Sequence, residues 1–111
     1  MKRPLALILA TLALTIGLAA CSISRPLTDS EFRGFCYTSI GRRASCDTIS
    51  ICNDFDTNVL SVKHASREAC VKACQDVYNR LYVPNEFDGC VPTVMMANNW
   101  CAKYCNTNYP K

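Results

Sequence analysis

The sequence predicts a small, disulfide-rich α+β domain built from about three short helices and one β-hairpin. Three observations lead to this prediction. Cysteine supplies nine of the 111 residues, a density typical of a disulfide scaffold in an exported chain. Three segments carry apolar residues and cysteines at helical spacing, whereas residues 47–63 alternate β-branched with polar residues.

The first helix is predicted to begin after Thr28. Thr28 and Glu31 have the spacing of a capping box, and Leu27 and Phe32 occupy the two positions of a hydrophobic staple. Helical spacing also predicts a shared inner face for Phe32, Phe35, Cys36 and Ile40. The interior glycine of this segment lowers its helix propensity, so a strand over residues 34–40 is the alternative.

Residues 47–63 are predicted to form the β-hairpin. The stretches "DTISIC" and "NVLSVK" alternate β-branched with polar residues, and the turn-rich "NDFDT" separates them. Within this turn, Asp54, Asp56 and Asn58 match the first three ligand positions of a calcium loop. The glycine and the bidentate glutamate that such a loop needs further on are absent. We therefore expect an ordinary turn here, with no metal bound.

Two more helices are predicted in the second half of the chain. One is capped by Ser66 and ends at Pro84, and the other begins near Pro92 or Thr93 and ends at about Cys105. Their expected inner faces comprise Cys70, Cys74, Val77, Tyr78 and Leu81 in the first and Val94, Ala97, Cys101, Tyr104 and Cys105 in the second.

The strings "CVKAC" and "CAKYC" within these helices constrain the disulfides. Helical residues four apart have Cβ atoms about 5–6 Å apart, whereas a disulfide needs about 3.8 Å, so each cysteine must reach another element. Antiparallel helices allow this if Cys74 pairs with Cys101 and the outer cysteines, Cys70 and Cys105, pair as well, although other partners stay open. The pattern resembles, in spacing only, the twin C-x3-C helical hairpins of small exported or intermembrane-space proteins. Structural bridges are expected to use Cys36, Cys46, Cys52, Cys70, Cys74, Cys90, Cys101 and Cys105.

Residues 1–20 have the build of an export signal, with two basic residues followed by an uncharged apolar stretch and small residues. An uncleaved membrane anchor is the alternative reading of this stretch. The tetrad Leu18-Ala19-Ala20-Cys21 resembles the lipobox of bacterial lipoproteins. The resemblance implies that the signal is cleaved before Cys21 and that the cysteine thiol carries a diacylglycerol.

Lipidation of Cys21 would also explain the odd cysteine count, because it leaves an even number to pair. The expected organisation is a signal peptide over 1–20, a lipidated tether over 21–27 and a disulfide-stabilised domain over 28–111. Ser22 follows the cysteine, where Gram-negative lipoproteins of the inner membrane tend to have Asp. The resemblance thus implies a lipid-anchored protein of the cell envelope, at the outer membrane and facing the oxidising periplasm.

The mature chain carries no enzyme signature. Ten Lys and Arg against nine Asp and Glu remain after residues 1–20 are removed, which disfavours nucleic-acid binding. The cysteines never show the C-x-x-C spacing of thioredoxin-like enzymes and zinc sites. His64 is the single histidine, and no nucleophile elbow is present. We therefore assign no catalytic residue, metal or cofactor.

The predicted function is a non-enzymatic binding or structural module, anchored to the membrane by its lipid, with another envelope protein or the cell wall as partner. One alternative is an inhibitor or immunity-type protein against an envelope-targeting hydrolase or toxin. Another is a thiol–disulfide oxidoreductase that works through the C-x3-C pairs. Candidate interface side chains of the types found at binding hot spots are Tyr82, Phe87, Met95, Met96, Trp100 and Tyr109. Core packing is the alternative role for Trp100.

Overall fold

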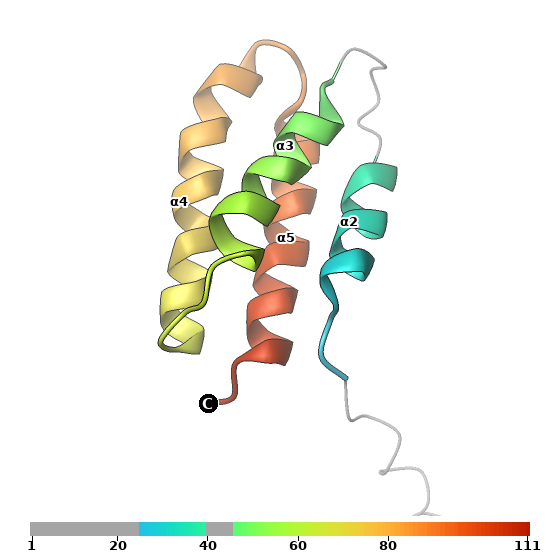
Figure 1. Ribbon diagram of the computed structural model, residues 1–111. Helices are drawn as coiled ribbons and strands as arrows, with labels where there is room; N and C mark the ends of the chain where they lie inside the picture. Colours follow the sequence, from blue (N-terminus) through green and yellow to red (C-terminus); the bar gives the residue numbers. More distant parts are fainter. Residues whose placement is uncertain (1–24, 40–45) are drawn as a thin grey trace, which may run out of the picture.

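The computed structural model describes residues 25–39 and 46–111 (Figure 1). The predicted signal, Cys21 and Ile40 lie outside the described residues. Within them the chain forms four α-helices and one π-helical turn. These elements are α2 (Asp29–Thr38), α3 (Thr48–Phe55), the π-helical η2 (Asp56–Leu60), α4 (Arg67–Glu86) and α5 (Val91–Asn108).

The four helices form a bundle around α5. α4 and α5 run antiparallel and share the most extensive interface, while α3 with η2 and α2 pack against the remaining sides of α5 (Figure 1). α5 therefore contacts every other helical element of the described chain. Because of this arrangement, α5 positions most of the surface features described below.

The predicted α+β class is wrong, because the described residues contain no strand. Residues 47–63, predicted as a β-hairpin, form α3, η2 and the start of the following loop. Asp47 caps α3, where its side chain accepts a hydrogen bond from the Ser50 N–H at 3.0 Å. In a strand, Ile49 and Ile51 would lie on the same face. Here Ile49 is 63% exposed and Ile51 is 4% exposed, which places them on opposite sides of a helix. The buried residues of this segment are Ile51, Cys52, Phe55, Asp56, Val59 and Leu60.

α2 begins as the sequence predicts. The Glu31 N–H donates to Thr28 Oγ1 at 3.2 Å and the Thr28 N–H donates to Glu31 Oε2 at 3.0 Å, which confirms the capping box. The staple residues Leu27 and Phe32 are 6% and 0% exposed. The inner face is narrower than predicted, because Phe35 is 43% exposed.

α4 and α5 also begin where expected. Ser66 caps α4 by accepting a hydrogen bond from the Ala69 N–H at 3.1 Å, and Pro92 lies in the first turn of α5. The predicted end of α4 at Pro84 is wrong, since the helix continues to Glu86. A proline in the last turn removes one hydrogen bond, but too little helix follows it for a kink to matter.

Four disulfides cross-link the helices. They are Cys36–Cys52, Cys46–Cys90, Cys70–Cys105 and Cys74–Cys101. The last two join α4 to α5, with Cα–Cα distances of 5.6 and 5.9 Å, and they are the pairing that the sequence predicts. Seven of the eight cysteines are buried, and Cys46 is half-buried. Sulfur therefore fills much of the core.

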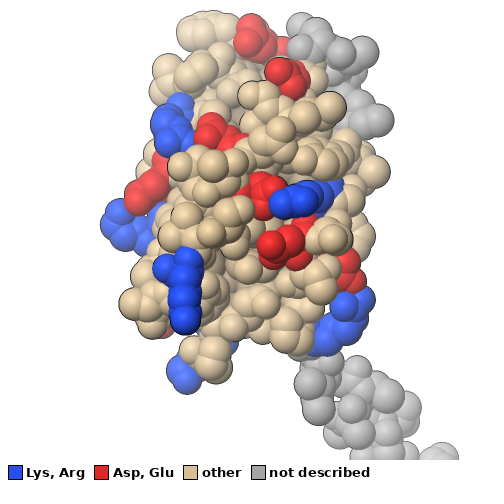
Figure 2. Space-filling view, viewed as in Figure 1, with Lys and Arg blue, Asp and Glu red and all other residues tan. Residues whose placement is uncertain are grey.

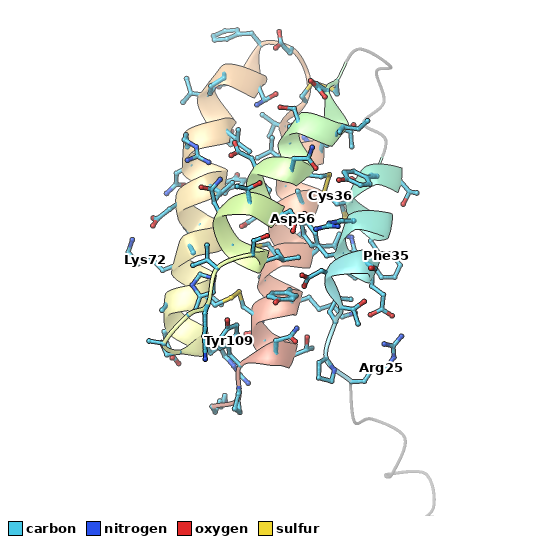
Figure 3. All side chains as sticks on the ribbon, in the orientation of Figure 1. Arg25, Phe35, Cys36, Asp56, Lys72 and Tyr109 are labelled. Carbon is cyan, nitrogen blue, oxygen red and sulfur yellow. A yellow bond between two sulfur atoms is a disulfide. The ribbon has the colours of Figure 1, made fainter. Side chains whose placement is uncertain are left out.

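The bundle has two different ends. At the tether end, α2 and α4 begin and α5 ends, and Arg25 leads into α2 (Figure 3). At the distal end, the loop between α4 and α5 is tied by Cys90 to Cys46, just before α3. On the face shown in Figure 2, the uppermost charged side chains, at the distal end, are acidic and the lowermost are basic.

Candidate functional site

A shallow groove runs between α2 and α5 at the tether end. Its volume is about 240 Å³, and it is lined by Arg25, Leu27, Glu31, Phe35 and Lys103. The lining combines two apolar side chains with two cationic ones and one carboxylate. We call this feature the α2–α5 groove.

A stacked aromatic pair adjoins the α2–α5 groove through Phe35, one of the lining residues. Phe35 from α2 stacks on Trp100 from α5, with ring centroids 4.2 Å apart and an interplanar angle of 9°. Lys103 Nζ lies 5.0 Å from the centroid of the Trp100 ring, within cation–π range. Met96, one turn before Trp100, is 44% exposed and extends the same face of α5. The result is an apolar surface with a cation at its edge.

The segment that leads into α2 is fixed to the end of α5. The Leu27 N–H donates to Thr107 Oγ1 at 3.0 Å, and Asn108 Nδ2 donates to the Leu27 carbonyl at 2.8 Å. Arg25 is paired with Glu31. The hydrogen bond from the Thr28 N–H, and then that from Arg25, lower the pKa of Glu31. These contacts set the geometry of the groove mouth.

The opposite side of α2 is held by an ion pair. Arg33 Nε donates to Asp56 Oδ2 at 2.6 Å and joins α2 to η2 (Figure 3). The Asp56 side chain is 12% exposed, and its other oxygen has no described partner. The polar groups around Asp56 thus connect α2 to η2, and none of them lines the α2–α5 groove.

Burial raises the pKa of Tyr104 on α5, and after burial the negative charge of Asp29 raises it as well.

The residues of the calcium-like motif do not converge. Asp54 accepts a hydrogen bond from Arg80 Nη2 at 2.8 Å, and Asp56 is paired with Arg33. Asn58 Nδ2 donates to the Asp54 carbonyl at 2.8 Å. The ordinary turn expected here is wrong, because these residues lie in α3 and η2, where each carboxylate pairs with a different helix.

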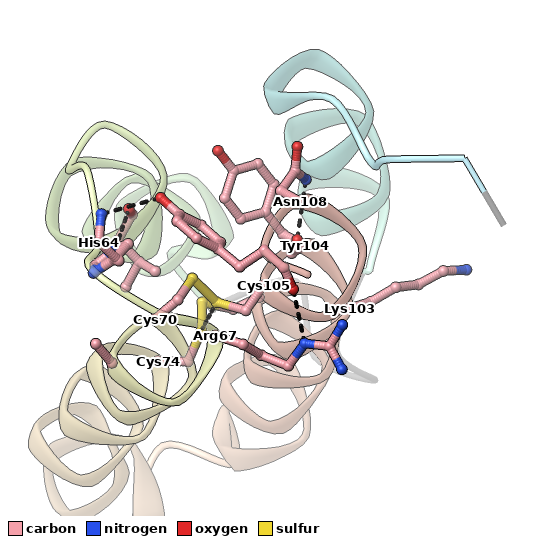
Figure 4. The surroundings of a disulfide bond; sticks show 12 residues. His64, Arg67, Cys70, Cys74, Lys103, Tyr104, Cys105 and Asn108 are labelled. Carbon is pink, nitrogen blue, oxygen red and sulfur yellow. Dashed lines mark hydrogen bonds between the residues drawn. A yellow bond between two sulfur atoms is a disulfide. The ribbon is translucent and has the colours of Figure 1, made fainter. Parts of the chain in front are cut away.

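His64 lies in the loop before α4, next to the end of the chain (Figure 4). Its backbone N–H donates to the Tyr109 hydroxyl at 3.1 Å, and its Nε2 lies 2.8 Å from the Val59 carbonyl. The Tyr109 ring meets the His64 ring edge-on at 5.7 Å. Arg67 Nε donates to the Tyr109 carbonyl at 2.8 Å. His64 therefore serves to pin the C-terminus to the η2–α4 loop.

Sulfur atoms are concentrated between α4 and α5. Cys74 Sγ lies 3.6 Å from Cys105 Sγ, so the bridges Cys70–Cys105 and Cys74–Cys101 touch. Three of these sulfurs are close enough together for metal binding, but each is already bonded to another sulfur. A metal needs the thiolate form of cysteine, so this cluster acts as a cross-link.

Apolar side chains are also exposed at the distal end. Phe87 is 90% exposed, and Val83, one turn earlier on α4, is 63% exposed. The turn that follows depends on Gly89, whose φ of 72° lies in the left-handed region that favours glycine. Exposed acidic side chains surround this tip and are those of Asp47, Glu86 and Asp88.

The predicted interface residues do not form one surface. Phe87 belongs to the distal end, whereas Trp100 stacks on the groove residue Phe35 and Met96 lies one turn before Trp100 on α5. Met95 is 49% exposed on α5, and Tyr82 and Tyr109 are half-buried. Arg25, Phe35 and Lys103 were not predicted as surface groups. Arg25 and Lys103 match no motif, and the spacing of Phe35 predicts the inner face of its helix.

No protein-family model, curated protein or solved structure matches this chain. Among the described helices, none combines the length and the apolar character that crossing a bilayer requires.

Proposed function

We propose that this protein is a lipid-anchored, non-enzymatic binding module of the cell envelope. Cys21 carries the lipid, the tether end faces the membrane, and the distal end meets another envelope protein. The lipobox supports the anchor. The four disulfides support a location in an oxidising compartment, because disulfides form and persist there.

The observation that carries the proposal is the exposure of Phe87, together with Val83, at the end of the bundle farthest from the tether. Phe87 has the highest exposed fraction among the large apolar side chains of the described residues, 90%, and Val83 is 63% exposed one turn earlier. Exposed apolar side chains that lie together are typical of protein–protein contacts. Cys90, buried in its bridge to Cys46, gives this tip a rigid base. A rigid aromatic on an exposed tip loses little conformational entropy when it enters a pocket.

Site-specific photo-crosslinking in intact cells tests the partner. We expect a photoreactive residue at position 87 to give one defined adduct, identified by mass spectrometry. Lys72 is exposed on α4 and paired only with Asp76, so the same probe at position 72 is the matched control and should give no such adduct. Recovery of a hydrolase in a stoichiometric complex would establish the inhibitor alternative. Equal labelling at positions 87 and 72 would refute the distal binding end.

The anchor has a separate test. Intact-mass analysis of the protein from its native cells should show cleavage before Cys21 and an added diacylglycerol. A Cys21→Ser variant should accumulate unprocessed or leave the membrane. If the parent protein is itself full-length in the membrane, with Cys21 unmodified, the uncleaved anchor is the correct reading of residues 1–20.

A further inference from the structure

We infer that the α2–α5 groove lies on the surface of the membrane that anchors the chain, where it binds anionic lipid headgroups. This inference rests on the proposed lipidation of Cys21. It adds an orientation to the proposed function, because contact at the groove would direct the distal end away from the membrane.

The first step is the length of the tether. The sequence predicts a tether over 21–27, but Leu27 is buried and bonded to Thr107 and Asn108 at the end of α5. Cys21 therefore precedes Arg25, the first residue that lines the groove, by only four positions. Four residues span at most about 14 Å. A lipid on Cys21 thus holds the groove mouth within that distance of the headgroups.

The second step is the chemistry of the surface. Trp concentrates at membrane interfaces, where its apolar ring and polar N–H both find partners. Lys and Arg lay their aliphatic stems on apolar groups and direct their charges to the headgroups. The groove offers this combination, since Trp100 stacks on Phe35 and lies beneath the exposed Lys103. Two stacked rings with a cationic side chain at their edge suit the membrane–water interface better than they suit a deep apolar pocket.

The third step is the charge of the tether end. Exposed basic side chains there include Lys63, Lys103 and Lys111, none of which has a described ion-pair partner. The carboxylates of Asp29, Glu31 and Glu68 lie at the same end. Glu31 is already neutralised by Arg25 and by the Thr28 N–H. Among the described residues, the distal end carries exposed Asp47, Glu86 and Asp88, which anionic lipid repels. Arg42 and Arg43 fall between α2 and α3, outside the described residues. The described charges therefore favour the tether end as the side that meets lipid.

Trp100 makes this inference directly measurable, because it is the only tryptophan in the chain. We would reconstitute the protein purified from its native membrane into vesicles that contain brominated lipids, which quench tryptophan at short range. One set of vesicles is zwitterionic and the other contains phosphatidylglycerol. We expect strong quenching and a blue shift of Trp100 in anionic vesicles, weak quenching in zwitterionic ones, and loss of the difference at high salt.

Two substitutions locate the contact. Lys103→Gln should weaken the association of the groove with anionic vesicles roughly fivefold, the effect expected for one basic residue near such a surface. Lys72→Gln removes an exposed lysine of α4 outside the groove and should leave Trp100 quenching unchanged. Circular dichroism spectra of both variants should match the parent, because neither side chain is buried.

The two readouts distinguish a failure of the groove contact from a failure of the lipid anchor. Retention on zwitterionic vesicles and the intact mass report on the lipid, whereas the difference in Trp100 quenching between the two vesicle types reports on the groove. An unlipidated chain that is still quenched by anionic vesicles would refute the anchor and support the groove contact. Equal quenching in both vesicle types, or equal effects of the two substitutions, would overturn the inference. So would a Trp100 that stays unquenched in brominated anionic vesicles.

Discussion

The tether end and the distal end of this bundle are stabilised in different ways. At the tether end, two touching disulfides, Cys70–Cys105 and Cys74–Cys101, join the first turns of α4 to the last turns of α5. Side-chain hydrogen bonds then attach the segment before α2 and the C-terminus to the same place. Toward the distal end, Cys46–Cys90 ties the α4–α5 loop to the start of α3, Cys36–Cys52 joins the last turn of α2 to α3, and Phe87 is almost fully exposed.

The paired bridges between α4 and α5 thus lie at the tether end, whereas the most exposed large apolar side chain of the described residues, Phe87, lies at the distal end. In the proposed lipid-anchored protein, the end with the paired bridges lies beside the membrane. A binding tip needs accessible apolar area, which costs little stability if the base of the tip is covalently fixed. Cys90 supplies that fixation at the start of α5.

The largest expected effect comes from removing the bridges. Replacing both α4–α5 bridges by alanine pairs should cost roughly 6 kcal/mol by the chain-entropy model, since the second bridge closes only a short extra loop. Replacing Cys46 and Cys90 alone should cost roughly 4 kcal/mol for their separation of 44 residues. A domain stable by about 5–15 kcal/mol is brought near or past unfolding by the first change.

Urea denaturation followed by circular dichroism measures both variants. The parent protein and a variant with only Cys70→Ala and Cys105→Ala are the controls, and the latter should lie between the extremes. If removal of the Cys46–Cys90 bridge unfolds the chain while removal of both α4–α5 bridges does not, the distal end is the structural core and the comparison is reversed.

The same cysteines show how much the sequence can predict. The C-x3-C strings predict the α4–α5 pairing because helix geometry forbids a bridge within one helix and favours the inner and outer pairs across two. Likewise Thr28 and Ser66 mark helix starts through local hydrogen bonds. The C-x3-C pairing and these helix starts, which follow from helix geometry and local caps, were therefore correctly predicted, whereas the end of α4 at Pro84 was not.

Contacts between segments far apart in the sequence explain why the hairpin and the buried position of Phe35 were wrongly predicted. The alternation around Ile49 and Ile51 is compatible with a strand. The helix that forms instead is capped by Asp47 and buries Phe55, and Cys52 bridges it to α2. Phe35 has the spacing of the inner face, but α5 places Trp100 against it at the surface. In both regions the missing information is which element packs against the segment, and local spacing does not contain it.

Two ion pairs provide a further test of the difference between the tether end and the distal end, with smaller expected losses of stability. Arg33→Ala leaves the Asp56 carboxylate, which is 12% exposed, without its described partner, so we expect a loss of about 1–2 kcal/mol, reduced because the arginine is half exposed. Arg80→Ala removes a more exposed pair with Asp54, nearer the distal end, and should cost under about 1 kcal/mol. Chemical denaturation of both variants checks the order. Equal losses of stability would show that the Arg33–Asp56 pair contributes no more than an exposed surface ion pair.

The two exposed phenylalanines give a closer test. Phe35→Ala removes a ring stacked on Trp100 and should cost at least about 0.5–1.5 kcal/mol, with a change in Trp100 fluorescence. Phe87→Ala removes a ring that is 90% exposed and should change stability by less than about 0.5 kcal/mol. Thermal unfolding and fluorescence measure both. A large loss from Phe87→Ala would mean that the distal ring serves folding, and its proposed role in binding would lose its support.

The smallest expected effect is the pH dependence of the α2 start. The backbone N–H of Thr28, and then Arg25, lower the pKa of the exposed Glu31 carboxyl below its ordinary value of 4.5. A carboxyl whose pKa is lower in the folded state stabilises the fold above that ordinary value, and the contribution is lost as pH falls through the lowered value. Glu31→Gln should therefore be less stable than the parent at pH 7, and the two proteins should converge below the lowered pKa.

Glu86 provides the matched control for Glu31, because its exposed carboxylate has no described hydrogen bond or ion pair at the distal end. Glu86→Gln should change stability by less than about 0.5 kcal/mol at pH 7 in urea denaturation. High salt should shrink the Glu31 effect, since the Arg25 pair is exposed. If Glu31→Gln shows no pH-dependent difference, the capping box does not fix the start of α2. The close attachment of the groove to the tether would then depend only on the hydrogen bonds of Leu27.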